Sequence, residues 1–192
     1  AKEHIGHYLP FELKWVEEPI ARDDVLGYCE LSETFEGASF KFACGEQAAS
    51  PVIFKQLLKS GGIGYCQIDA VRVAGVNDVM AIILMAAKFG VPVCPHGGGI
   101  ALCNMIQHYG MWDQIAVSGH SDTQLVEYID FLQDSVEHPV RTKSGHYVTP
   151  VAPGWGLEFK ADFLADHTFP SGKIWRERPE NRRGVHFECD LG

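Results

Sequence analysis

Short apolar runs of strand length alternate along the chain with amphipathic or apolar stretches of helix length. The predicted strands cover residues 14–16, 40–44, 63–68 and 91–94, with a weaker one at 115–118. The predicted helices cover residues 23–34, 52–59, 79–89 and 100–109, and a last one runs from 127 to about 136. Strands that alternate with helices predict a parallel sheet, because each helix carries the chain back to start the next strand.

One ionisable residue stands at or next to the end of each predicted strand. The five are Glu17, Glu46, Asp69, His96 and Glu127, and the steps between them are 29, 23, 27 and 31 residues. Each step has the length of one strand, loop and helix, so we predict about five βα units. The carboxyl ends of parallel strands form the ligand-binding edge of a sheet. A barrel would bring all five groups to one point, whereas an open sheet would gather only those beside its switch point, so we predict an α/β barrel.

His96 lies where the run at 91–94 enters three consecutive glycines (97–99). Histidine titrates near neutral pH, so this position suits proton transfer. Asp69, on the preceding strand, can accept the proton of one ring nitrogen and leave the other facing a substrate. The alternatives are a structural histidine bonded to a carbonyl, and an Asp69 that orders the following loop with Arg72. The glycines are not a nucleotide-binding loop, because they lack both the GxGxxG spacing and a P-loop lysine.

Three further acids have candidate roles. Glu17 and Glu46, on adjacent strands, are hard oxygen ligands of the kind that Mg²⁺ takes together with water. Alternatively, Glu17 forms a solvated turn pair with Glu18, and Glu46 pairs with a lysine. Glu127 has apolar neighbours, which favour its protonated form and let it donate a hydrogen bond. Its alternative role is that of an acid at a helix N-terminus, stabilised by the helix dipole.

Composition narrows the choice of partner. The chain has 192 residues, 46% of them hydrophobic, which is enough for one domain with a core. A formal net charge of −9 and a pI near 5.4 disfavour nucleic acids and anionic membranes and leave small polar substrates. The sequence shows neither a membrane span nor a signal peptide, so we expect the cytosol or the mitochondrial matrix.

Six cysteines are scattered along the chain without a CxxC pair, and several lie in apolar runs. We therefore expect reduced and mostly buried thiols. A zinc site formed by Cys94, His96 and Cys103 would match no standard zinc spacing, so we do not predict one.

Five segments carry a resemblance to a known family. They read WVEEP, ACGEQ, QIDAVRVAGVND, AAKFGVPVCPHGGG and LVEYID, and they follow in register over most of residues 10–180. Together they resemble the C-terminal part of acid-sugar dehydratases of the mandelate racemase group of the enolase superfamily, the L-fuconate dehydratases above all. The resemblance implies a (β/α)7β TIM-like barrel in which three carboxylates hold Mg²⁺, two of them matching Glu17 and Glu46.

The same resemblance implies a reaction. Dehydratases of this group convert a sugar acid, here an L-fuconate-like aldonate, to a 2-keto-3-deoxy acid through an enolate. His96 matches the acid that helps the β-hydroxyl leave, Asp69 matches its partner, and Glu127 matches the group that hydrogen-bonds the enolate oxygen. The alternatives are an epimerase or racemase of 2-hydroxy acids on the same scaffold, and a non-catalytic remnant that serves as an interaction module.

The sequence also departs from the family pattern. Residues 1–13 contain neither the third metal-binding aspartate nor the Lys-x-Lys strand whose lysine removes the α-proton. A whole barrel takes roughly 250 residues, so we expect a C-terminal fragment, a nicked product or one subunit of a split enzyme that is inactive by itself. We expect residues 1–148 to form the partial barrel and residues 149–192 a tail that packs toward an absent capping domain. The expected partners are a sugar acid, the N-terminal part of the barrel with its cap, and further copies of the chain.

Overall fold

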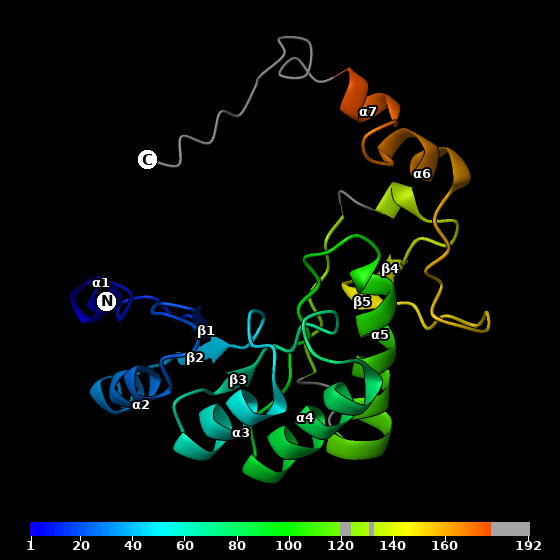
Figure 1. Cartoon of the computed structure of the whole chain (residues 1–192). Coiled ribbons are helices and arrows are strands. Elements are labelled where there is room, and N and C mark those ends of the chain that lie inside the picture. Colours follow the sequence, from blue (N-terminus) through cyan, green and yellow to red (C-terminus); the bar gives the residue numbers. More distant parts are fainter. Residues whose placement is uncertain (120–123, 131–132, 178–192) are drawn as a thin grey trace, which may run out of the picture.

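A parallel sheet with helices along one face forms the body of the molecule. The computed structural model describes residues 1–119, 124–130 and 133–177. Strands β1 (Trp15–Glu17), β2 (Lys41–Cys44) and β3 (Tyr65–Cys66) lie in the order β1-β2-β3, and both pairings are parallel. In Figure 1, helices α2, α3 and α4 follow one another along the same side of these strands. The structure thus confirms the predicted α/β fold with parallel strands.

The sheet continues beyond β3 into the segment that carries His96. The Cys66 N–H donates to the Pro92 carbonyl at 2.9 Å, and the Cys94 N–H donates to the Cys66 carbonyl at 2.9 Å. The His96 N–H then bonds the Ile68 carbonyl at 3.0 Å. These bonds repeat the parallel pattern, so the predicted strand at 91–94 occupies the fourth position in the sheet.

Each outer helix begins and ends where local sequence signals place it. Helix α2 (Val25–Thr34) starts at Asp24, whose carboxylate accepts the Gly27 N–H. Helix α3 (Pro51–Ser60) starts at Ser50, whose side chain accepts the Val52 N–H, and ends at the left-handed Gly61. Helix α4 (Val76–Phe89) ends at Gly90 in the same conformation. A short helix, α1 (Lys2–Gly6), was not predicted from the sequence.

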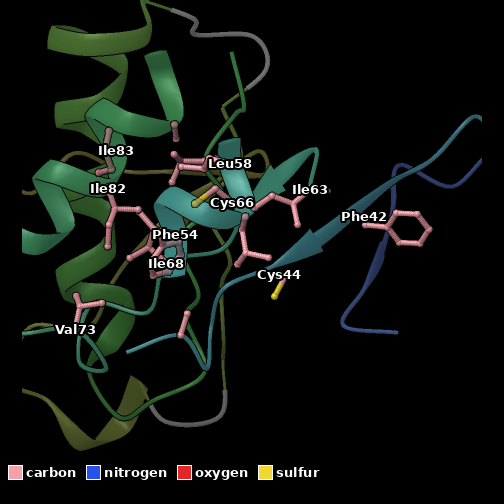
Figure 2. Close-up of a cluster of buried hydrophobic side chains, with 14 of the residues drawn as sticks. Phe42, Cys44, Phe54, Leu58, Ile63, Cys66, Ile68, Val73, Ile82 and Ile83 are labelled. Carbon is pink, nitrogen blue, oxygen red and sulfur yellow. The ribbon is translucent and has the colours of Figure 1, made fainter. Parts of the chain in front are cut away.

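The main core lies between the sheet and the helices. Alternate residues of β2 and β3 turn toward this layer, and Figure 2 shows them within one buried cluster with side chains of α3 and α4. The strand residues include Phe42, Cys44 and Cys66, and Phe54 of α3 is fully buried among them. Burying a side chain of this size contributes about 1.5–3 kcal/mol. The intervening strand residues lie on the opposite face of the sheet. On that face, the ring centroids of Trp15 and Tyr65 are 4.9 Å apart.

Two predictions for the fifth unit are wrong. Residues 115–118 are not a strand: helix α5 (Leu102–Trp112) continues directly into the π-helical turn Asp113–Ser118, which ends at the left-handed Gly119. The helix predicted from 127 to about 136 is not formed in the described part of that range, where residues 127–130 are irregular and Gln133–Ser135 form a 3-10 turn. A helix that has already formed extends at little cost, so the short apolar run joined α5 rather than starting a strand.

The C-terminal part contacts α5 through the amide of Asn104 and the ring of Trp155, which lies 5.2 Å from that of His108. It contains the hairpin of β4 (Thr142–Lys143) and β5 (His146–Tyr147), followed by α6 (Ala161–His167) and α7 (Lys173–Arg176). The buried Asn104 amide donates to the carbonyls of His138 and Gly156, both at 2.9 Å. The domain boundary after residue 148 and the packing toward a cap stay predictions. None of the described helices is long and apolar enough to span a bilayer.

Candidate active site

His96 is the centre of a cluster of acidic side chains at the carboxyl edge of the sheet. Its Nδ1 lies 3.0 Å from Asp69 Oδ2, and its side chain is only 16% exposed. The other oxygen of Asp69 accepts the Val71 N–H at 2.9 Å, and the Arg72 guanidinium lies 3.7 Å from Oδ2. Asp69 therefore does both things considered from the sequence, because it orders the following loop and also fixes the imidazole.

The second nitrogen of His96 faces two more carboxylates. Its Nε2 lies 3.2 Å from Glu46 Oε2 and 3.9 Å from Glu127 Oε2. Glu46 also accepts the Gln47 amide at 2.9 Å, and no lysine is within ion-pair distance of it among the described residues. Glu127 accepts the Gly97 N–H at 2.7 Å. The structure thus brings four of the five expected residues together around one imidazole.

Glycines make this geometry sterically accessible. The chain leaves β2 for Glu46 through Gly45, whose φ of 137° is unfavourable for other residues. A side chain there would also come within 2.7 Å of the Phe54 ring and 2.8 Å of the Gln67 carbonyl. A Cβ on Gly98 would lie 2.5 Å from His96 Nε2. Glycine at these two positions keeps the approach to the imidazole open.

This arrangement suits the transfer of a single proton. Asp69 accepts a hydrogen bond from Nδ1, which leaves Nε2 as the nitrogen that can give or take a proton on the open side. The described bonds of the His96 ring are to carboxylates and not to a carbonyl, unlike those of the structural alternative.

Glu17 stands apart from this cluster. Its Oε2 accepts two hydrogen bonds, from the Gln67 amide at 2.7 Å and from the Trp15 indole at 3.2 Å. Glu18 is not simply half of a solvated turn pair, since it packs against Cys44, whose thiol is 3.7 Å from Glu18 Oε1. Burial, and then the nearby charge of Glu46, raise the pKa of Glu18.

The carboxylates at this edge are ligands of the type that Mg²⁺ binds, but only two of them are candidate ligands of the metal. Glu17 and Glu46 offer hard carboxylate oxygens at the ends of adjacent strands. Within the described residues, however, no group of three or more His, Cys, Asp or Glu side chains is arranged to hold a metal ion. The five cysteines of the described residues are free, and burial raises the pKa of the Cys94 thiol to about 12.

Sequence reasoning missed the partners of Glu17. Gln67 lies two residues before Asp69 and therefore on the same face of the strand, and Trp15 lies two residues before Glu17. This two-residue spacing was the available signal. It carried little weight alone, because a strand residue of either type is usually part of the packing.

The fold and the site together define a class: a partial βα barrel with an aspartate–histidine pair among carboxylates at the carboxyl edge of its strands. The chain belongs to the enolase C-terminal domain-like family, whose model matches residues 1–163. This confirms the resemblance to the enolase superfamily.

Named relatives agree with this assignment. Human mitochondrial enolase superfamily member 1 is 37% identical over 177 residues, which are 92% of this chain and 40% of the relative. L-galactonate dehydratase of Hypocrea jecorina is 36% identical over 171 residues, covering 89% of this chain and 37% of that enzyme. The chain thus spans about two fifths of the length of these relatives.

Solved structures show the same fold. The crystal structure of the human protein superposes with a TM-score of 0.88 at 36% identity, over 91% of this chain and 40% of that one. A Polaromonas L-talarate dehydratase structure, which contains Mg and L-glucarate, gives a TM-score of 0.71 at 22% identity over 85% of this chain and 42% of that one. At that identity, the second comparison supports the barrel fold alone.

Proposed function

We propose that this chain supplies the acid–base half of a Mg²⁺-dependent sugar-acid dehydratase, a hydro-lyase. One observation carries the proposal: His96 is bonded to Asp69 through Nδ1 and faces Glu46 and Glu127 through Nε2. Dehydration requires a proton for the leaving hydroxyl, and Nε2 is the imidazole nitrogen that is not bound to Asp69 and can give it. Relatives named as galactonate dehydratases favour the same chemistry.

Each group in the proposed reaction has one task. A base from the N-terminal part of the barrel removes the proton from C2 of the sugar acid. His96 Nε2 then donates its proton to the hydroxyl on C3, the C–O bond breaks, and water leaves. The resulting enol takes up a proton at C3, loses the proton of its C2 hydroxyl and becomes a 2-keto-3-deoxy acid. Asp69 keeps Nδ1 protonated throughout, and Glu127 hydrogen-bonds the substrate oxygen on which negative charge develops.

Glu17 and Glu46 are the residues that would hold Mg²⁺. A cation bound there supplies positive charge that lowers the cost of forming the enolate. With two carboxylates, much of the coordination shell stays water, and Mg²⁺ loses its water reluctantly. We therefore infer that a third carboxylate comes from outside this chain, together with the base.

The proposed substrate is a six-carbon aldonate of the L-galactonate and L-fuconate type. L-Fuconate is L-galactonate without the oxygen on C6, so one site can accept both when it recognises carbons 1 to 5. The L-galactonate dehydratase relative favours this configuration. The cytosol or the mitochondrial matrix stays the expected compartment, and the name of the human relative favours the matrix.

The test replaces His96 in the enzyme completed with the N-terminal barrel strands and cap. We expect His96→Asn to lose at least about 10²-fold in kcat, the usual contribution of a general acid, while Mg²⁺ affinity stays nearly unchanged. His138→Asn is the matched control, because His138 also faces a carboxylate, Glu158 at 3.7 Å, but on the exposed surface. Normal turnover of L-galactonate and L-fuconate by His96→Asn would refute the role.

Epimerisation at C2 is the second candidate, since a histidine held by an aspartate can also exchange a proton with carbon. Incubation in D₂O separates the two reactions. A 2-keto product that reacts with semicarbazide supports dehydration. Deuterium that enters C2 of an otherwise unchanged sugar acid supports epimerisation, and the absence of either product from the completed enzyme supports the non-catalytic alternative.

A further inference from the structure

Gln67 is a buried polar residue that has no evident benefit for stability. Its side chain is only 4% exposed, yet its Oε1 has no hydrogen-bond partner. Its Nε2 donates one side-chain bond, to Glu17 Oε2 at 2.7 Å. Leaving a buried acceptor unpaired is unfavourable, so an apolar residue at this position would serve the core better. Buried polar groups of this kind call for an explanation beyond packing.

The sheet geometry directs Gln67 toward Glu17. Strand β2 lies between them, and its residue in register with Glu17 is Ala43, followed two positions later by Gly45. No long side chain of β2 therefore stands between Gln67 and Glu17. The donor end of the amide faces the carboxylate, which is the only orientation that an ionised acid accepts. Gln67 is buried and Glu17 is exposed on the edge strand, so the buried amide restrains the exposed carboxylate.

We propose that Gln67 is a positioning residue that holds the Glu17 carboxylate ready to bind a divalent cation. Gln67 and Trp15 both donate to Oε2, and no described bond involves Oε1. One oxygen is thus fixed by the protein and the other is left for the cation. Groups that orient a metal ligand in this way typically contribute about 10- to 100-fold to metal affinity. This inference rests on the proposed role of Glu17 as a ligand of Mg²⁺.

The test measures cation binding to the enzyme completed with the N-terminal barrel strands and cap, and needs no activity. Mn²⁺ is the probe, because it takes the same oxygen ligands as Mg²⁺ and its free aqueous form is counted by electron paramagnetic resonance. Gln67→Met keeps the length of the side chain and removes the amide, and Gln67→Leu is the second variant. We expect each to bind Mn²⁺ roughly tenfold more weakly while its melting temperature stays equal or rises. Gln56→Leu, at an exposed glutamine of α3, is the control and should match the wild type.

A double-mutant cycle shows whether Gln67 acts through Glu17. Glu17→Gln should weaken Mn²⁺ binding by itself, and adding Gln67→Met to it should weaken binding no further. Unchanged affinity in both Gln67 variants would overturn the inference, as would a lower melting temperature with unchanged affinity, which marks a purely structural role. An equal loss in the Glu17→Gln background would also overturn it. If the wild type fails to bind Mn²⁺, or Glu17→Gln binds it normally, the proposed metal role of Glu17 fails as well.

Discussion

Gly98→Ala tests whether the backbone beside His96 must be free of side chains. A Cβ on Gly98 would lie 2.5 Å from Nε2 and 2.7 Å from Cε1 of the imidazole, whereas ordinary contacts begin near 3.4 Å. The ring cannot simply swing aside, because its Nδ1 is bound to Asp69 at 3.0 Å. Either the ring or the glycine loop must therefore move by about 1 Å.

A displacement of this size has a defined catalytic cost. Misplacing a reacting group by about 1 Å can lower the rate about 10²-fold, which corresponds to about 2.7 kcal/mol of activation free energy. We expect this loss in kcat of the completed enzyme rather than in KM, because the methyl group affects the proton donor and not the proposed cation ligands. The stability of the fold should change little, since Gly98 is exposed.

The control is the neighbouring glycine. A Cβ on Gly99 would meet nothing closer than Leu102 Cβ at 3.4 Å, so Gly99→Ala should keep most of the activity. The assay follows release of the 2-keto acid with semicarbazide, and long-range ¹H–¹⁵N spectra of the imidazole follow the bond from Nδ1 to Asp69. Wild-type kcat for Gly98→Ala, or an equal loss for Gly99→Ala, would refute the steric reasoning.

Three further predictions follow from other parts of the structure. Asn104→Ala removes the two hydrogen bonds to the His138 and Gly156 carbonyls and should lower the unfolding free energy by about 1–3 kcal/mol, measured by chemical denaturation. An unchanged denaturation midpoint would contradict this role of Asn104. Burial raises the pKa of the Cys44 and Cys94 thiols to about 12, so at pH 8 these thiols are almost entirely protonated. They should therefore resist alkylation in the folded protein but react in urea, and peptide mass spectrometry measures the extent of labelling. The 192-residue chain alone should bind Mg²⁺ weakly and leave sugar acids unchanged, and robust dehydration by it would show that the base and the third carboxylate are not needed from elsewhere.

The order of the sheet and the strand ends that carry Glu17, Glu46, Asp69 and His96 could be predicted from sequence alone. Strand and helix periodicities are local, and signals such as Ser50 before Pro51 define where a helix starts through contacts within one turn. The rule that parallel strands end at one edge then places Glu46, Asp69 and His96 together without knowledge of their contacts. In the structure, the carboxylates of Asp69 and Glu46 lie 3.0 Å and 3.2 Å from the His96 ring.

Contacts between distant segments were decided only by the tertiary structure. Whether residues 115–118 formed a strand or extended α5 depended on the helix already formed beside them, and the local pattern fits both. The partner of Glu46 is His96 rather than a lysine, because the Gly45 turn directs the carboxylate toward the imidazole. The bond from Gln67 to Glu17 joins residues 50 positions apart across β2. No local pattern encodes such a pairing, because it exists only once the strands have aligned.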